Sequence, residues 1–161
     1  MELLVIKGKS EIGKTTIATL LHNKVAQIEG IQLKWMMYDH KVLPIEEKDF
    51  CGDSMPDFRS VFLNNDRLIG IVSHGDSVLY AKQFIRQMIN EFHVDILIVC
   101  SSIDGKNWEM LNKVFGDYIK EENVFDATSY YCPKDRYDGL RVKEDLVNDI
   151  INKINQIYSR I

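Results

Sequence analysis

The chain has 161 residues, of which 45% are apolar, and it carries 20 Lys and Arg against 24 Asp and Glu, a formal net charge of −4 at pH 7. Proteins that neutralise many phosphates usually carry a basic surplus, so this balance argues against general binding to nucleic acids or anionic membranes. No apolar run approaches the roughly 20 residues of a membrane-spanning helix, and the first residues lack the pattern of a signal peptide. We therefore expect a single cytoplasmic domain over residues 1–161, with neither nucleic acid nor membrane among its partners.

The cysteines Cys51, Cys100 and Cys132 are scattered along the chain without a C-x-x-C pair. This spacing fits reduced thiols in a reducing compartment and gives no zinc-binding pattern. Because Cys100 lies inside an apolar run, we expect it to be a small core residue.

The first apolar run, residues 3–6, is followed by G-K-S-E-I-G-K-T-T at residues 8–16. The spacing G-x-x-x-x-G-K-[ST] is typical of a phosphate-binding loop, whose backbone N–H groups surround a polyphosphate while the lysine reaches its terminal oxygens. The motif requires a strand before it and a helix after it. Apolar residues at helical spacing over 17–28, with Gly30 beyond them, predict that helix. We expect the nucleotide to contact Gly8, Lys9, Ser10, Glu11, Ile12, Gly13, Lys14, Thr15 and Thr16.

Within this segment, Lys14 is the expected catalytic cation, because its ammonium group would neutralise charge on the β- and γ-phosphates. Thr15 is the expected metal ligand, since the hydroxyl that follows the lysine binds Mg²⁺ in such loops. The N-terminus of the following helix adds a dipole that favours anions.

Further strands and helices alternate along the chain. Residues 31–38 predict a second strand, and residues 40–57 form a long connection of the kind that is usually functional. Residues 59–63 and 68–73 predict a hairpin, since the residues between them, N-N-D-R, tolerate the left-handed conformations of tight turns. Apolar spacing over 78–92 predicts the next helix.

The second half of the chain continues this alternation. The unbroken apolar run at 95–100 predicts a strand buried on both faces, and residues 108–119 suggest a helix that Gly116 can interrupt. A last strand is expected at 124–130, followed by a loop and a closing helix over 142–161. The pattern predicts an α/β three-layer sandwich with a mostly parallel sheet of five to six strands.

Over residues 8–16 the chain resembles the P-loop nucleoside triphosphate hydrolase superfamily, which implies that fold type and places Thr16 opposite the α-phosphate. Lys9 is similar in position to the early lysine of partition-type ATPases, which carry G-K-G-G-x-G-K-[ST] and use that lysine across a dimer interface. Here Ser10 and Glu11 replace the two glycines. No closer family is identified from these residues.

The resemblance also directs attention to acids at strand ends. Asp39, after the second strand, is expected to organise the nucleophile, as the acid at this strand end does in small-molecule kinases. P-loop enzymes usually place a metal-organising aspartate where this chain has Ser73. Asp76, three residues on, is expected to take part in catalysis and metal binding through a water; alternatively, Asp76 or Ser77 caps the helix that follows.

The function that the resemblance implies is binding of Mg²⁺ and ATP with hydrolysis or transfer of the γ-phosphate, by a nucleotide or small-metabolite kinase with its small-molecule acceptor. A regulatory or partition-type ATPase that works through a homodimer or a protein partner is the alternative. A switch driven by GTP is a further alternative, although Asp104 is all that residues 101–104 keep of the guanine-reading motif N-K-x-D. Arg136 and Arg141 are expected on the loop after the last strand, which in P-loop kinases often covers the adenine, or they are ordinary surface charges.

Overall fold

The first strand, β1 (Glu2–Gly8), is buried along its centre. Its side chains from Leu3 to Ile6 are 0% exposed. On one side β1 pairs in parallel with β6 (Ile96–Ser102), and on the other side it pairs in parallel with β7 (Ile119–Asp126). A strand in this position needs apolar residues on both of its faces, which is the pattern of the sequence. The predicted first strand is confirmed.

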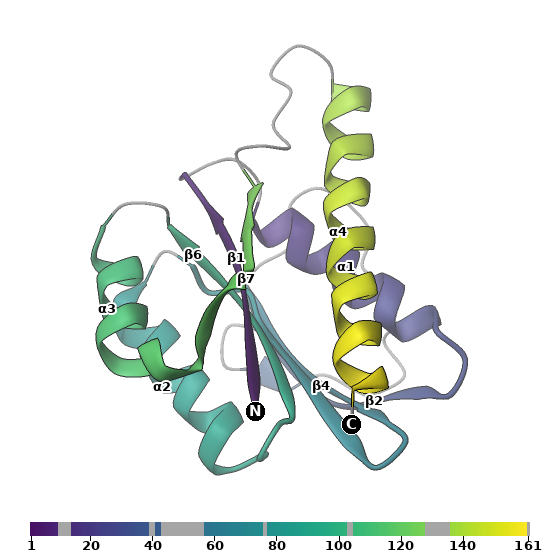
Figure 1. Ribbon diagram of the computed structural model, residues 1–161, viewed down its shortest axis with the longest axis horizontal. Helices are drawn as coiled ribbons and strands as arrows, with labels where there is room; N and C mark the ends of the chain where they lie inside the picture. Colours follow the sequence, from purple (N-terminus) through teal and green to yellow (C-terminus); the bar gives the residue numbers. More distant parts are fainter. Residues whose placement is uncertain are drawn as a thin grey trace.

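The computed structural model describes residues 1–9, 14–38, 41–42, 57–75, 77–102, 105–127 and 136–160. Within them, seven strands form one mixed sheet in the order β3-β2-β4-β5-β6-β1-β7 (Figure 1). The strands not yet located are β2 (Ile31–Tyr38), β3 (Lys41–Val42), β4 (Phe58–Asn64) and β5 (Arg67–Val72). β5 is parallel to β6, whereas β4 is antiparallel to both β5 and β2, so β2 points the same way as the parallel strands.

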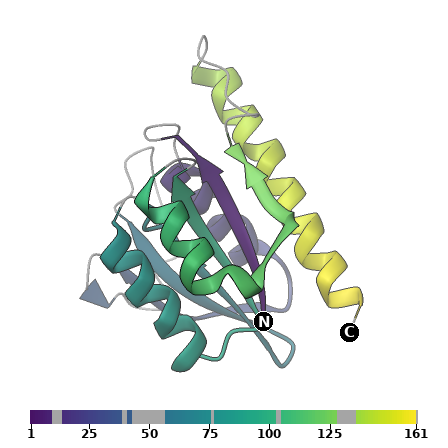
Figure 2. The ribbon, with the colours of Figure 1, turned by 60° about the vertical axis from the view of Figure 1, so that its left-hand side comes forward.

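Helices cover both faces of the sheet, as Figures 1 and 2 show. α1 (Lys14–Gln27) and α4 (Arg136–Ser159) pack on one face, in a core that includes Leu4 and Ile6. α2 (Val78–Asn90) and α3 (Lys106–Phe115) pack on the other face, in a core that includes Leu3 and Val5. Because successive side chains of a strand point to opposite faces, β1 contributes to both cores. The α/β class and the three layers are confirmed.

The sheet has one strand more than the expected five to six, because β3 lies inside the predicted connection and is too short, at two residues, to leave a pattern. The other strands of this half match the prediction. β2 has the expected bounds, and β4 and β5 form the expected hairpin, with Asn65 in its turn at a φ of 45°. β6 is buried on both faces, as predicted.

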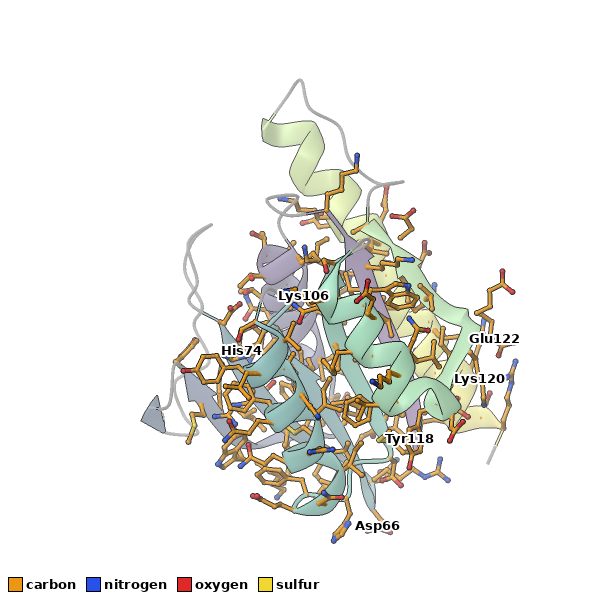
Figure 3. All side chains as sticks on the ribbon, turned by 90° about the vertical axis from the view of Figure 1, so that its left-hand side faces the viewer. Asp66, His74, Lys106, Tyr118, Lys120 and Glu122 are labelled. Atoms are coloured by element: carbon orange, nitrogen blue, oxygen red, sulfur yellow. The ribbon has the colours of Figure 1, made fainter. Side chains whose placement is uncertain are left out.

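The predicted helix at 108–119 ends earlier than expected. α3 stops at Phe115, Gly116 begins a short 3-10 turn, and β7 starts at Ile119, five residues before the predicted strand. β7 is an edge strand, and its exposed residues 120–122, K-E-E, give no apolar alternation. Charged side chains on an edge strand discourage pairing with another chain. Here they also interrupt the apolar pattern from which a strand is predicted. Figure 3 shows Lys120 and Glu122 on this outer side.

The closing helix α4 begins earlier than predicted, so Arg136 and Arg141 belong to the helix and not to a loop. Figure 2 shows the first turns of α4 extending past the end of β7. A helix segment that covers no sheet needs no apolar stripe, which explains why the pattern begins only at Val142. α4 has 24 residues, yet neither it nor any other helix in the described ranges has the length and apolarity that a membrane span requires.

A buried histidine connects α1 to the sheet. His22 is 0% exposed, and its Nδ1 lies 2.9 Å from the hydroxyl oxygen of Ser60 on β4. Its ring also packs against those of Phe58 and Phe62, with centroids 5.4 and 4.8 Å away. Burial lowers the pKa of His22 to about 3, because an imidazolium ion would lose its hydration there.

We expect acid to destabilise the protein through His22. Between about pH 6.5 and pH 3 the unfolded chain binds a proton that the folded protein does not, so stability is complete above pH 6.5 and falls below it. The loss is roughly 1 kcal/mol of unfolding free energy per pH unit. Chemical denaturation at pH 7, 6 and 5 measures this slope. The variant His22→Gln does not titrate and should lack this contribution, and equal slopes in the two proteins would contradict the assignment.

Candidate functional site

One edge of the sheet brings together the ends of several elements. β1 ends there at Gly8, β6 ends at Ser102, and α1 begins at Lys14. Because β4 runs antiparallel to β5, its start lies at this edge too, and Asp57 directly precedes it. Open α/β sheets bind their ligands at the carboxyl ends of the parallel strands, so this edge is the candidate site.

Labelled residues in Figure 3 mark which end of the sheet this edge is. His74, just beyond β5, and Lys106, the first residue of α3, lie toward it. Asp66, in the turn between β4 and β5, lies at the opposite end of the sheet.

Lys14 is a buried cation at this edge. It is 7% exposed, and its Nζ donates hydrogen bonds to the backbone carbonyls of Gly8, at 3.0 Å, and Lys9, at 2.8 Å. Within the described ranges, no carboxylate forms an ion pair with it. The ammonium group is therefore held by neutral oxygens. Anionic phosphate oxygens would make stronger hydrogen bonds with it, because both partners would then be charged.

A carboxylate and two hydroxyl groups meet at the start of α1. The Oγ1 of Thr15 donates to Oδ1 of Asp57 at 3.0 Å, and the Oγ of Ser73 donates to the same oxygen at 3.2 Å. Ser73 Oγ also accepts the N–H of Phe58 at 2.8 Å, which ties the start of β4 to the residue after β5. Among the described residues, none donates to Oδ2 of Asp57. This cluster supplies the oxygen ligands that Mg²⁺ prefers.

The described residues contain no group of three or more His, Cys, Asp and Glu side chains that would enclose a metal ion. A single carboxylate beside a hydroxyl group instead suits Mg²⁺, which usually keeps several waters and takes its remaining ligands from substrate phosphates. The residues present at this edge therefore fit a magnesium ion that arrives with a phosphorylated ligand.

The segment after β5 passes close to Lys14. A Cβ atom at Gly75 would lie 3.3 Å from Cε of Lys14 and 3.2 Å from Cβ of Cys100, both tighter than ordinary contacts. Asn107 in α3 holds the segment by donating its amide N–H to the Gly75 carbonyl. The Cys100 thiol donates to the Lys14 carbonyl at 3.6 Å, which ties β6 to the start of α1. Cys100 is 3% exposed, so the prediction of a core cysteine is confirmed.

The structure brings together part of the predicted site. Gly8 and Lys9 lie at the end of β1, and Lys14, Thr15 and Thr16 form the first turn of α1. Several predicted residues lie outside the described ranges: Ser10, Glu11, Ile12, Gly13, Asp39, Asp76 and Asp104.

Asp57 is a site residue that sequence reasoning missed. It closes the long connection at 40–57, and a signal for it was present in the sequence. The predicted hairpin implied that its first strand runs antiparallel to its second, so an acid just before the first strand had to lie at the same edge as Gly8. Ser73 occupies the position where an aspartate was expected, and it donates a hydrogen bond to the aspartate that lies there instead.

Comparison of the chain with protein-family models, with curated proteins and with solved structures gives no match. The function is therefore argued from the side chains that meet at this edge.

We expect Gly75→Ala to displace the side chain of Lys14 and thereby to weaken any binding of magnesium ATP at this edge by roughly tenfold, a loss of about 1.4 kcal/mol. The new methyl group would overlap its neighbours by only a few tenths of an ångström, so the fold should be retained. Gly116→Ala is the matched control, because a Cβ there meets nothing within 4 Å. Isothermal titration calorimetry measures both affinities, and equal values would contradict the proposed contact.

Proposed function

We propose that this chain binds a nucleoside triphosphate, expected to be ATP, together with Mg²⁺, and that it hydrolyses or transfers the γ-phosphate. The observation that carries the proposal is the hydrogen bond between Thr15 and Asp57, 3.0 Å long, beside the buried ammonium group of Lys14. The segment at 8–15 joins a buried strand to a helix, which is the context that its glycine and lysine spacing requires.

Lys14 has a direct role in this proposal. Its Nζ lies between the end of β1 and the start of α1, held by the carbonyls of Gly8 and Lys9. Phosphoryl transfer builds negative charge on the transferred group, and a fixed cation stabilises this charge without having to reorganise. The carbonyl contacts keep the side chain in place before the nucleotide arrives.

Thr15 and Asp57 would hold the metal. When bound, Mg²⁺ offsets the negative charge of the β- and γ-phosphate oxygens. Thr15 would offer its hydroxyl oxygen to the ion while its O–H still donates a hydrogen bond to Asp57. Asp57 would bind the ion directly or through a water. Ser73 positions the carboxylate by donating to its Oδ1. Asp39 and Asp76 stay predictions as groups that organise the nucleophile.

We expect magnesium ATP and magnesium ADP to raise the unfolding temperature, and GTP and GDP to have little effect. A ligand at about 100 times its dissociation constant adds about 2.7 kcal/mol of stability, which a thermal-shift assay detects. A preference for GTP would favour a switch over a kinase or an ATPase. No shift with any of the four nucleotides would overturn the proposal.

The lysine variants test catalysis in an assay of ATP hydrolysis. Lys14→Ala should abolish nucleotide turnover while the protein stays folded, because it removes the cation that faces the phosphates. Lys24→Ala removes an exposed lysine from the same helix and should leave turnover unchanged. Hydrolysis of ATP at the wild-type rate by the Lys14 variant would refute the assignment.

We expect Asp57→Asn to raise the Mg²⁺ concentration needed for half-maximal turnover by about tenfold or more, because an amide is a weaker ligand than a carboxylate and removal of groups that orient metal ligands has effects of this size. Asp66→Asn, at the opposite end of the sheet, is the control of equal charge change and should behave like the wild type. Magnesium titrations at constant ATP distinguish the two. An unchanged magnesium requirement in Asp57→Asn would remove this residue from the metal site.

A further inference from the structure

Arg59 on β4 is a buried arginine that forms no ion pair with a described carboxylate, although the negative charge of Glu91 nearby raises its pKa. It is 4% exposed, and its guanidinium group donates to the side-chain oxygen of Gln87 and to the sulfur of Met37. Within the described ranges no acid forms an ion pair with it, and its buried Nε–H has no hydrogen-bond partner. Burial lowers the pKa of Arg59 to about 10, so the group still carries its charge at neutral pH.

Such an arrangement is costly unless something compensates the charge, because a buried cation loses its hydration. Part of the compensation comes from aromatic rings: the Cζ of Arg59 lies 3.4 Å from the ring centroid of Phe84 and 5.5 Å from that of Trp35. Rings accept a cation over their faces but offer no partner to the Nε–H, which lies in the plane of the guanidinium group. The unsatisfied donor therefore indicates an acceptor that the described chain does not provide.

Arg59 lines a pocket of about 360 Å³ between α2 and the neighbouring strands β4 and β2. This volume lies within the range of small-molecule sites. The pocket lies on the α2 side of the sheet, and none of its lining residues belongs to the contacts of Lys14, Thr15 or Asp57. Its polar lining consists of Arg59, Arg86, Gln83, Gln87, Asn90 and Glu91.

The charges of this lining favour one class of ligand. Two guanidinium groups and the carboxylate of Glu91 sum to +2 − 1 = +1, which a single negative charge balances. Gln87 donates to Glu91 at 3.1 Å, so this acid is held beside the residue that contacts Arg59. Its negative charge disfavours a dianion such as phosphate. A carboxylate matches the planar fork of a guanidinium group, and the amide side chains can bond a neighbouring hydroxyl.

We propose that the pocket beside Arg59 binds a small organic acid with a single carboxylate and a neighbouring hydroxyl group. The carboxylate would accept hydrogen bonds from Arg59 and Arg86, and the hydroxyl would bond the amides of Gln83 or Asn90. The proposal goes beyond nucleotide chemistry and does not rest on it, because no residue of the pocket belongs to the nucleotide site.

L-Lactate is the probe for this site, and its neutral analogue L-lactamide is the control for charge. In ¹⁵N–¹H spectra of the full chain, sodium lactate should shift the Arg59 Nε–H signal with saturation at a dissociation constant on the order of 1 mM. The Arg59→Lys variant, which lacks this signal, assigns it. Lactamide, and sodium chloride at the same ionic strength, should not shift it. An equal response to lactamide or to chloride would overturn the proposal.

Arg86→Gln should weaken lactate binding about tenfold. Lys82→Gln removes the same charge from the same helix outside the pocket and should leave the affinity within about twofold. Lactate affinity is measured from the ligand side by saturation-transfer NMR, which needs no assigned protein signal. Equal losses of lactate affinity in the two variants would show a general effect of charge and would overturn the proposed binding site. Tighter binding of inorganic phosphate than of lactate would overturn the ligand class.

Discussion

The burial of β1 on both faces and along both edges is the constraint on which the rest of the structure depends. A shift of its register by one residue would exchange Leu3 and Val5 with Leu4 and Ile6 between the two cores and would move the end of the strand along the sheet. That register determines where the strand ends, at Gly8, and so where Lys14 finds its carbonyl partners. The position of the Lys14 ammonium group is thus a consequence of how β1 packs in the two cores.

The antiparallel strand β4 is the second determinant of the site. In a wholly parallel sheet, side chains at this edge would come from the ends of strands, but β4 contributes its beginning. Asp57 reaches Thr15 for this reason, and Ser73 holds it by using its hydroxyl both as donor and as acceptor. A serine after β5 is therefore compatible with a metal site, since the carboxylate it lacks is supplied by the adjacent strand.

The parts of this fold that could be predicted from the sequence are those with strong burial. β1 and β6 were found because their apolar runs are unambiguous, and the segment at 8–16 because its spacing is rare. β7 was placed five residues late, because an edge strand needs few apolar side chains. Arg59 gave no pattern of its own, and the signal for Asp57 lay only in the predicted hairpin that it precedes. Their roles depend on the order of the strands, which a single sequence does not reveal but which decides what lies opposite each side chain.

The two proposed sites are neighbours in the sequence, because Asp57, just before β4, and Arg59 are separated by a single residue. β4 itself is a poor element for communication between them, because it is paired on both edges and tied to α1 through Ser60 and His22. Phe84 on α2 is better placed: its ring lies under the guanidinium group of Arg59 and 4.5 Å from the ring of His74. His74 directly follows Ser73, whose hydroxyl donates to Asp57, the carboxylate of the proposed metal site. The ring of Phe84 therefore connects Arg59, through His74, to the segment that contacts Asp57.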